Sequence, residues 1–165
     1  MFSTEGIVLK KIDAGETDAL FVIYTKDFGK IRALAQGVKR EEAKLKGHCE
    51  PLNLVSVQFV LGKSGERLTY AEIINSWPSI RMHLDKSKAA WYLVGLIDQH
   101  CFSGEKDEDL WNMFLRNLEL LDRGNFSEEE MRQFLDAFDR SLVFGLGYGD
   151  EENLEFLGTK LARPW

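Results

Sequence analysis

The hydrophobic pattern changes period at Pro78, and this change constrains the fold more than any other feature of the sequence. Upstream of Pro78, short apolar or alternating segments separated by turn residues are typical of β-strands. Downstream, apolar residues recur every three or four positions, as in amphipathic helices. The predicted strands are Glu5–Lys10, Ala19–Thr25, Lys30–Ala35, Leu52–Leu61 and Leu68–Ile74.

The number of strands and the lengths of their connections predict a small closed barrel. Five strands are too few for most sandwiches, and closure removes exposed strand edges. Three connections are short and rich in turn residues, whereas the third, Gly37–Pro51, is long and basic. A five-stranded barrel with a long connection between its third and fourth strands is the pattern of the OB fold. The pattern alone leaves an SH3-like barrel open.

The second half predicts a small helical bundle. One helix should begin at Ser79 and stop near Gly104, and a second should run from Asp107 to Leu121. Ser127 and Glu130 form a capping-box pattern before a third helix. A short fourth helix is expected at 152–160. The fold class is therefore α+β, with an OB-fold nucleic-acid-binding domain at 1–78 and a helical domain at 79–165.

Charge is distributed unevenly along the chain, whose net charge is −6. Residues 1–78 hold 11 Lys and Arg against 10 Asp and Glu, and residues 79–165 hold 10 against 17. Residues 26–46 alone hold seven basic and three acidic side chains. A basic segment on an acidic protein is a candidate anion-binding surface, with a solvated loop as the ordinary alternative.

Composition excludes several classes of protein. Hydrophobic residues make up 44% of the chain, enough for a folded core. No apolar run is long enough for a membrane span, and the first residues do not resemble a signal peptide. The two cysteines, Cys49 and Cys101, predict a reduced, cytoplasmic protein and do not suffice for a four-cysteine zinc site.

Sequence motifs of catalysis are missing or incomplete. Gly62–Ser64 resembles the end of a phosphate-binding loop, but Val57 occupies the position that requires glycine. The glycines of Gly145–Gly149 follow a helix, whereas a dinucleotide-binding turn must follow a strand. His48–Cys49 and His100–Cys101 are adjacent pairs whose side chains diverge, so they do not predict a metal site. We expect no catalytic residue, no metal and no cofactor.

Several blocks of the sequence, in the same order and spacing, resemble the RecO family of bacterial recombination mediators. They are Glu5–Leu9, Gly15–Asp18, Thr25–Lys30, Ala35–Arg40, Leu45–Leu52 and Leu68–Ile73, with a looser match at Phe144–Tyr148. The family usually runs longer, and many members carry a zinc-binding cysteine cluster after the glycine-rich segment. This chain has no such cluster, so we expect a minimal or truncated member without zinc.

The resemblance implies an OB domain followed by helices, in a protein without enzymatic activity. Such a protein binds single- and double-stranded DNA and anneals complementary strands. With its partner RecR, it helps to load the RecA recombinase onto strands covered by single-strand-binding protein. The resemblance places the protein in the bacterial cytoplasm, associated with the nucleoid.

Non-specific DNA affinity requires Lys and Arg for the phosphates and aromatic rings for stacking on bases. Lys39 and Arg40 are the strongest candidates because they match the basic block of the family, and Phe28 is the best candidate for stacking. The full set of candidate nucleic-acid-binding residues is Lys10, Lys11, Lys26, Phe28, Lys30, Arg32, Lys39, Arg40, Lys44 and Lys46.

The acidic second half is expected to bind a protein rather than DNA. The resemblance suggests the acidic, hydrophobic tail of single-strand-binding protein, and Arg81, Lys86 and Lys88, within two turns of one helix, are the candidate partners of its carboxylates. A second hypothesis is a protein-interaction adaptor, whose OB barrel docks repair proteins with little direct affinity for DNA.

Overall fold

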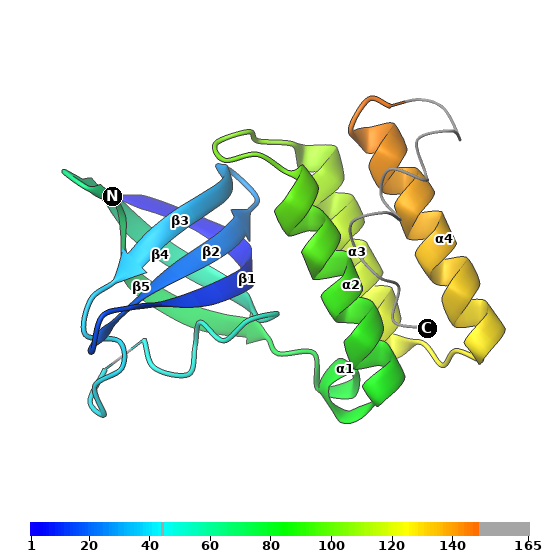
Figure 1. Ribbon diagram of the computed structural model, residues 1–165, viewed down its shortest axis with the longest axis horizontal. Helices are drawn as coiled ribbons and strands as arrows, with labels where there is room; N and C mark the ends of the chain where they lie inside the picture. Colours follow the sequence, from blue (N-terminus) through cyan, green and yellow to red (C-terminus); the bar gives the residue numbers. More distant parts are fainter. Residues whose placement is uncertain (44, 149–165) are drawn as a thin grey trace. The chain divides into compact units, whose positions relative to one another are not determined.

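The computed structural model describes residues 1–43 and 45–148, and its amino-terminal part is a β-barrel (Figure 1). The strands close in the order β1-β2-β3-β5-β4, and β4 returns to β1. The β3–β5 pairing is short and parallel, and the other four pairings are antiparallel. The predicted five-stranded barrel is confirmed. The strands are β1 (Phe2–Ala14), β2 (Asp18–Thr25), β3 (Gly29–Ala35), β4 (Leu54–Gly62) and β5 (Gly65–Asn75).

The two faces of each strand have different roles. Phe21 and Ile23 of β2 lie in the barrel core, so Val22 between them lies on the outer face. A register shift in β1 between Val8 and Lys10 marks a bulge, which lets this long strand bend from its pairing with β4 to its pairing with β2. The bulge fixes which residues of the second half of β1 share the outer face with Val22.

The long connection between β3 and β4 packs onto the barrel. Val38 and Cys49 belong to the barrel core, and Leu45 packs against it. At the end of the connection, the Leu52 amide donates to the Val8 carbonyl at 2.7 Å. The described part of this basic segment therefore has a definite place on the barrel.

The helical part contains α1 (Pro78–Met82), α2 (Leu84–His100), α3 (Glu108–Arg123) and α4 (Glu128–Gly145). The capping box is confirmed, because Ser127 and Glu130 each accept the other's backbone amide. The single helix predicted from Ser79 is wrong: His83 is extended and separates α1 from α2. The helix predicted at 152–160 lies outside the described residues. None of the described helices is long and apolar enough to cross a membrane.

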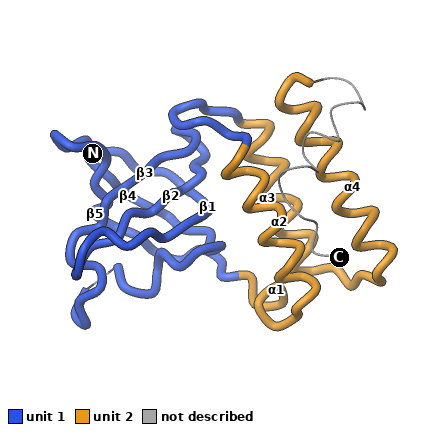
Figure 2. The backbone as a smooth tube through the Cα atoms, viewed as in Figure 1, with its two compact units in different colours: residues 1–76, 100–107 blue, residues 77–99, 108–165 orange. Residues whose placement is uncertain are grey.

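The chain divides into two compact units (Figure 2). One comprises residues 1–76 with 100–107, and the other comprises residues 77–99 with α3 and α4. α2 ends at His100 rather than near Gly104, because the 100–107 segment packs on the barrel instead. The Gly104 amide donates to the Lys30 carbonyl at 3.1 Å, and Ser103 forms β-bridges with Gly29 and Lys30.

Candidate nucleic-acid interface

The outer face of β1, β2 and β3 gathers three of the predicted cations. Val22 pairs with Lys10 on β1 and with Arg32 on β3, so these two cations flank it. Because neighbouring strands lie about 4.8 Å apart, the Cα atoms of Lys10 and Arg32 are roughly 10 Å apart. In another row of this face, Tyr24 pairs with Lys30. Lys10 and Arg32 are exposed, and Lys30 is half-buried.

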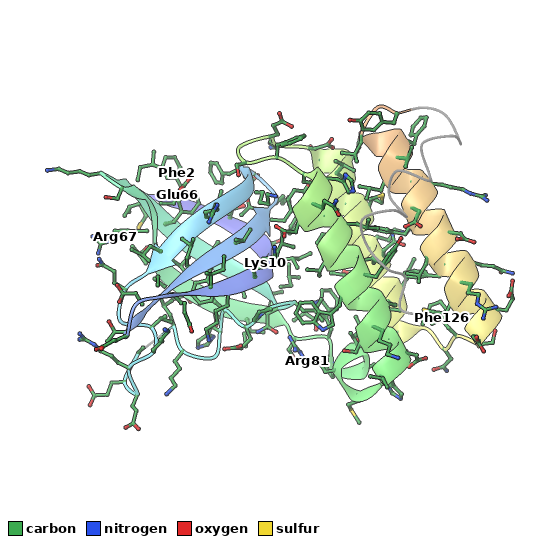
Figure 3. The ribbon with its side chains drawn as sticks, in the orientation of Figure 1. Phe2, Lys10, Glu66, Arg67, Arg81 and Phe126 are labelled. Carbon is green, nitrogen blue, oxygen red and sulfur yellow. The ribbon has the colours of Figure 1, made fainter. Side chains whose placement is uncertain are left out.

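A third row of this face is apolar and ends in a cation that the sequence analysis missed. Leu20 pairs with Ile12 and Leu34, and Leu34 pairs with Arg67 on β5. Figure 3 shows Lys10 and Arg67 at opposite sides of the barrel, so these cations follow its outer surface around several strands. They are hereafter the basic face: Lys10, Lys30, Arg32 and Arg67.

Lys39, the strongest sequence candidate together with Arg40, holds two loops together. Its Nζ lies 3.0 Å from Asp13 Oδ1 and donates to the Gly15 carbonyl at 2.8 Å. Its backbone amide donates to the Thr17 carbonyl at 2.9 Å. These contacts fasten the β3–β4 connection to the β1–β2 turn, whereas Arg40 is exposed.

Asp18 adds a second fastening between the same two loops. Its Oδ1 accepts the Gly37 amide at 2.7 Å and the Thr17 hydroxyl at 2.9 Å. The hydrogen bond from Gly37, then that from Thr17, and the nearby charges of Arg40 and Lys39 lower the pKa of the Asp18 carboxyl. Gly37 has φ +66°, a conformation that glycine adopts without strain.

The other candidates in this unit are dispersed. Lys11 pairs with Glu50 at 3.0 Å, Lys26 is exposed in the β2–β3 turn, and Lys46 is exposed in the β3–β4 connection. Lys44 lies outside the described residues. The length of β2, roughly 25 Å for eight residues, separates the β2–β3 turn from the β1–β2 turn beside Lys39.

Phe28 lies in an aromatic cluster at one end of the barrel. Its ring packs edge-on against Phe2 and Phe59, with centroid distances of 5.4 Å to each. The side chain is half-buried and packs against the barrel core. Its stacking on a base remains a prediction.

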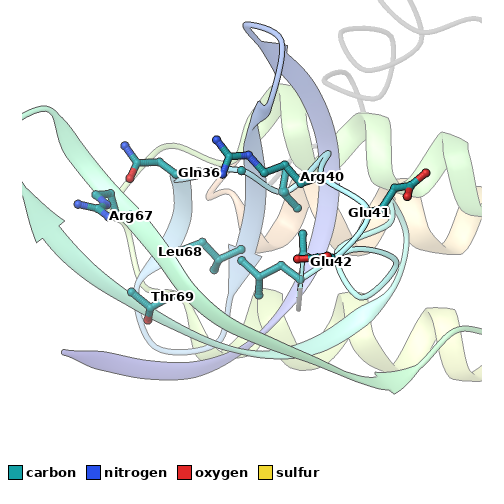
Figure 4. Close-up of a pocket in the computed structure, with 11 residues that line it drawn as sticks. Gln36, Arg40, Glu41, Glu42, Arg67, Leu68 and Thr69 are labelled. Atoms are coloured by element: carbon teal, nitrogen blue, oxygen red, sulfur yellow. The ribbon is translucent and has the colours of Figure 1, made fainter.

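A groove that the sequence did not predict lies between the β3–β4 connection and the start of β5. Its volume is about 890 Å³, and Arg40, Arg67 and Leu68 are among its lining residues (Figure 4). Lys63 is exposed in the β4–β5 turn nearby in sequence. The β4–β5 turn, Gly62–Gly65, could have indicated this region in the sequence, because the loop between the fourth and fifth strands borders the binding face of OB folds.

The three partner-binding candidates lie in different environments. Arg81 on α1 and Lys88 on α2 are exposed. Lys86 is buried, and its ammonium donates to Ser79 Oγ at 2.8 Å and to the Asp122 carbonyl at 3.0 Å. The expectation that one helix carries all three was wrong, because the chain breaks at His83.

Neither cysteine is in a reactive environment. Burial raises the pKa of the Cys49 thiol to about 12 and that of Cys101 to about 11. Both thiols are therefore protonated near neutral pH. Within residues 1–43 and 45–148, no group of three or more His, Cys, Asp or Glu side chains is arranged to hold a metal ion.

A closed five-stranded barrel with a long β3–β4 connection defines the amino-terminal unit as an OB-fold domain. Residues 1–77 match the family described as "Recombination protein O N terminal". The amino-terminal domain of this chain therefore belongs to the RecO family.

The most similar curated proteins include several named "DNA repair protein RecO". The one from Gloeobacter violaceus is 32% identical over 120 residues, which cover 73% of this chain and 46% of that protein. The one from Rubrobacter xylanophilus is 30% identical over 149 residues, which cover 90% of this chain and 58% of that protein. One from Dehalococcoides mccartyi is 33% identical over 152 residues, which cover 91% of this chain and 58% of that protein. The chain thus spans about half the length of these relatives.

Proposed function

We propose that this chain is a non-enzymatic DNA-binding protein of repair and homologous recombination. The observation that carries the proposal is the pair of exposed cations, Lys10 and Arg32, on the outer face of an OB barrel. OB folds bind oligonucleotides on the face of strands β2 and β3, where Arg32 lies, and Lys10 is on the adjoining strand β1. The name of the relatives, "DNA repair protein RecO", supports the cellular role.

The proposed binding is electrostatic and independent of sequence. Cations that neutralise phosphates release condensed counterions, and this release supplies most non-specific affinity for single and double strands. A surface that holds backbones without reading bases can bring two complementary strands together while their charge is partly neutralised. Strand annealing then requires no catalytic group.

The proposed partners follow from family membership. We assign RecR as the protein with which the chain helps to load a recombinase, in the bacterial cytoplasm and at the nucleoid. For the helical unit we propose docking of the acidic tail of single-strand-binding protein, with Arg81 and Lys88 as the exposed cations. The buried Lys86 would support this surface from within rather than meet the tail.

A salt titration of DNA binding tests the proposed function. Lys10→Glu with Arg32→Glu should weaken binding to any sequence and flatten the log–log salt dependence by about 2. Lys88→Glu with Arg140→Glu reverses the same number of exposed charges in the helical unit and is the control. If the slope of the salt dependence were unchanged in the Lys10→Glu, Arg32→Glu variant, these two cations would not contact phosphates.

The adaptor hypothesis has one supporting observation, the net charge of −7 on residues 79–165. A chain that acts only as an adaptor would show little DNA affinity even at low salt. Steep salt dependence in the unmodified protein would therefore reject the adaptor as the sole function.

A further inference from the structure

The geometry points to the groove beside Leu68 as a subsite for single-stranded DNA, which gives the barrel a preference for single strands over duplex. This inference rests on the proposed function and names the form of DNA that one part of the interface selects. Arg67 belongs both to the basic face and to the groove, so a strand held at Arg32 would reach the groove without leaving the barrel.

The lining of the groove combines an apolar floor with cations on its border. Val38 and Leu68 are buried core residues that line it, and Leu45 packs beside them. Figure 4 shows Arg67, Gln36 and Arg40 following one another along one border. Its volume, about 890 Å³, is within the range of sites that enclose small organic groups.

This combination fits an unstacked nucleotide better than a duplex. In a duplex the base faces are stacked on one another, and only phosphates and groove edges are accessible. A single strand can place a base against the apolar floor or against a guanidinium plane, while its phosphates meet the same arginines. A duplex could reach the cations on the border but not the floor.

The acidic residues of the groove limit where the backbone can run. In Figure 4, Glu41 lies beyond Arg40 at one end of the groove, and Glu42 lies below Arg40. Their carboxylates would repel phosphates there, so the backbone is expected along the border from Arg67 past Gln36 to Arg40. The charges thus specify one path for the strand.

The test compares the affinity of the full chain for an oligothymidylate of about 12 nucleotides, within the site size of one OB fold, and for a mixed-sequence duplex of the same length. Arg67→Lys keeps the charge but removes the planar guanidinium. It should lower single-strand affinity at least about fivefold and leave duplex affinity within about twofold. Arg116→Lys makes the same exchange at an exposed position on α3, outside the proposed DNA interface, and should change neither affinity by more than about twofold.

The outcomes separate this inference from the proposed function. If the unmodified chain binds neither DNA with salt-dependent affinity, the proposed function fails. If it binds both, and Arg67→Lys leaves single-strand affinity unchanged or lowers both affinities equally, the groove is not a single-strand subsite although the protein binds DNA. Gln36→Glu, an exposed change within the groove border, should also lower single-strand affinity more than duplex affinity.

Discussion

Lys39 and Asp13 form an ion pair between two loops of the barrel, with Nζ 3.0 Å from Oδ1. The two residues are 26 positions apart, and the pair holds the β3–β4 connection against the β1–β2 turn. The adjacent Arg40 is exposed and lines the groove. Two neighbouring cations that look equivalent in the sequence therefore have different environments.

Separate substitutions should distinguish these two cations. Arg40→Met should flatten the salt dependence of DNA binding by about 1, because it removes one phosphate contact. Lys39→Met should instead accelerate amide hydrogen exchange in residues 15–17, because it removes the contacts to Asp13 and Gly15. If both variants flattened the salt dependence of DNA binding by the same amount, and amide hydrogen exchange in Lys39→Met were unchanged, Lys39 would be a phosphate contact after all.

Asp18 should make the barrel sensitive to acid. Hydrogen bonds lower the pKa of its carboxyl in the folded chain below the ordinary value of 3.8. Its contribution to stability is therefore complete above that value and is lost as the pH falls through the lower, folded pKa. The urea midpoint of the unmodified chain should fall as the pH is lowered from about 5 to about 2, and Asp18→Asn should make this fall smaller.

A matched variant controls for the change in net charge. Glu16→Gln removes one negative charge from the β1–β2 turn, where Glu16 is exposed, and should retain the acid-dependent loss of stability. If Asp18→Asn and Glu16→Gln gave the same pH dependence as the unmodified chain, the assignment to Asp18 would be rejected.

Gly29 should not tolerate a side chain. Its φ is +63°, and a Cβ atom would come within van der Waals overlap of the backbone of Glu105 in the 100–107 segment. Gly29→Ala should lower the free energy of unfolding by more than about 2 kcal/mol, since backbone strain and a steric clash combine. Urea denaturation measures the loss.

Gly15 provides the control for the backbone conformation alone. It has φ +87°, and a Cβ atom would have no other atom within 4 Å. Gly15→Ala should cost only about 1 kcal/mol, the strain of a left-handed alanine. Equal losses in the two variants would mean that the 100–107 segment can move away from Gly29 at no cost.

Lys86 should be a stabilising residue of the helical unit. Lys86→Met keeps the side-chain length but leaves Ser79 Oγ and the Asp122 carbonyl without their donor, and it should cost about 1–3 kcal/mol. Lys88→Met changes an exposed lysine one half-turn away and should stay within about 0.5 kcal/mol. Thermal unfolding followed by helical circular dichroism measures both, and equal stability of the two variants would contradict the role given to Lys86.

Local sequence was sufficient for the types of elements and for several of their boundaries. Alternating apolar residues such as Val57 and Phe59 can bury only one face of a strand, and the change of period at Pro78 is a local property. The capping box of Ser127 and Glu130 spans three residues, so it too could be predicted. The break at His83 was missed because the helical pattern continues across it.

Hydrophobic period and charge counts were enough to predict a barrel followed by helices, with the excess of acidic residues in the helical half. They could not predict which cations of the barrel lie near one another. Lys10 and Arg32 flank Val22 because of strand register and the bulge in β1, and Arg67 joins them because β5 closes the barrel against β3. These placements depend on pairings between residues far apart in the chain, which hydrophobic periodicity does not encode.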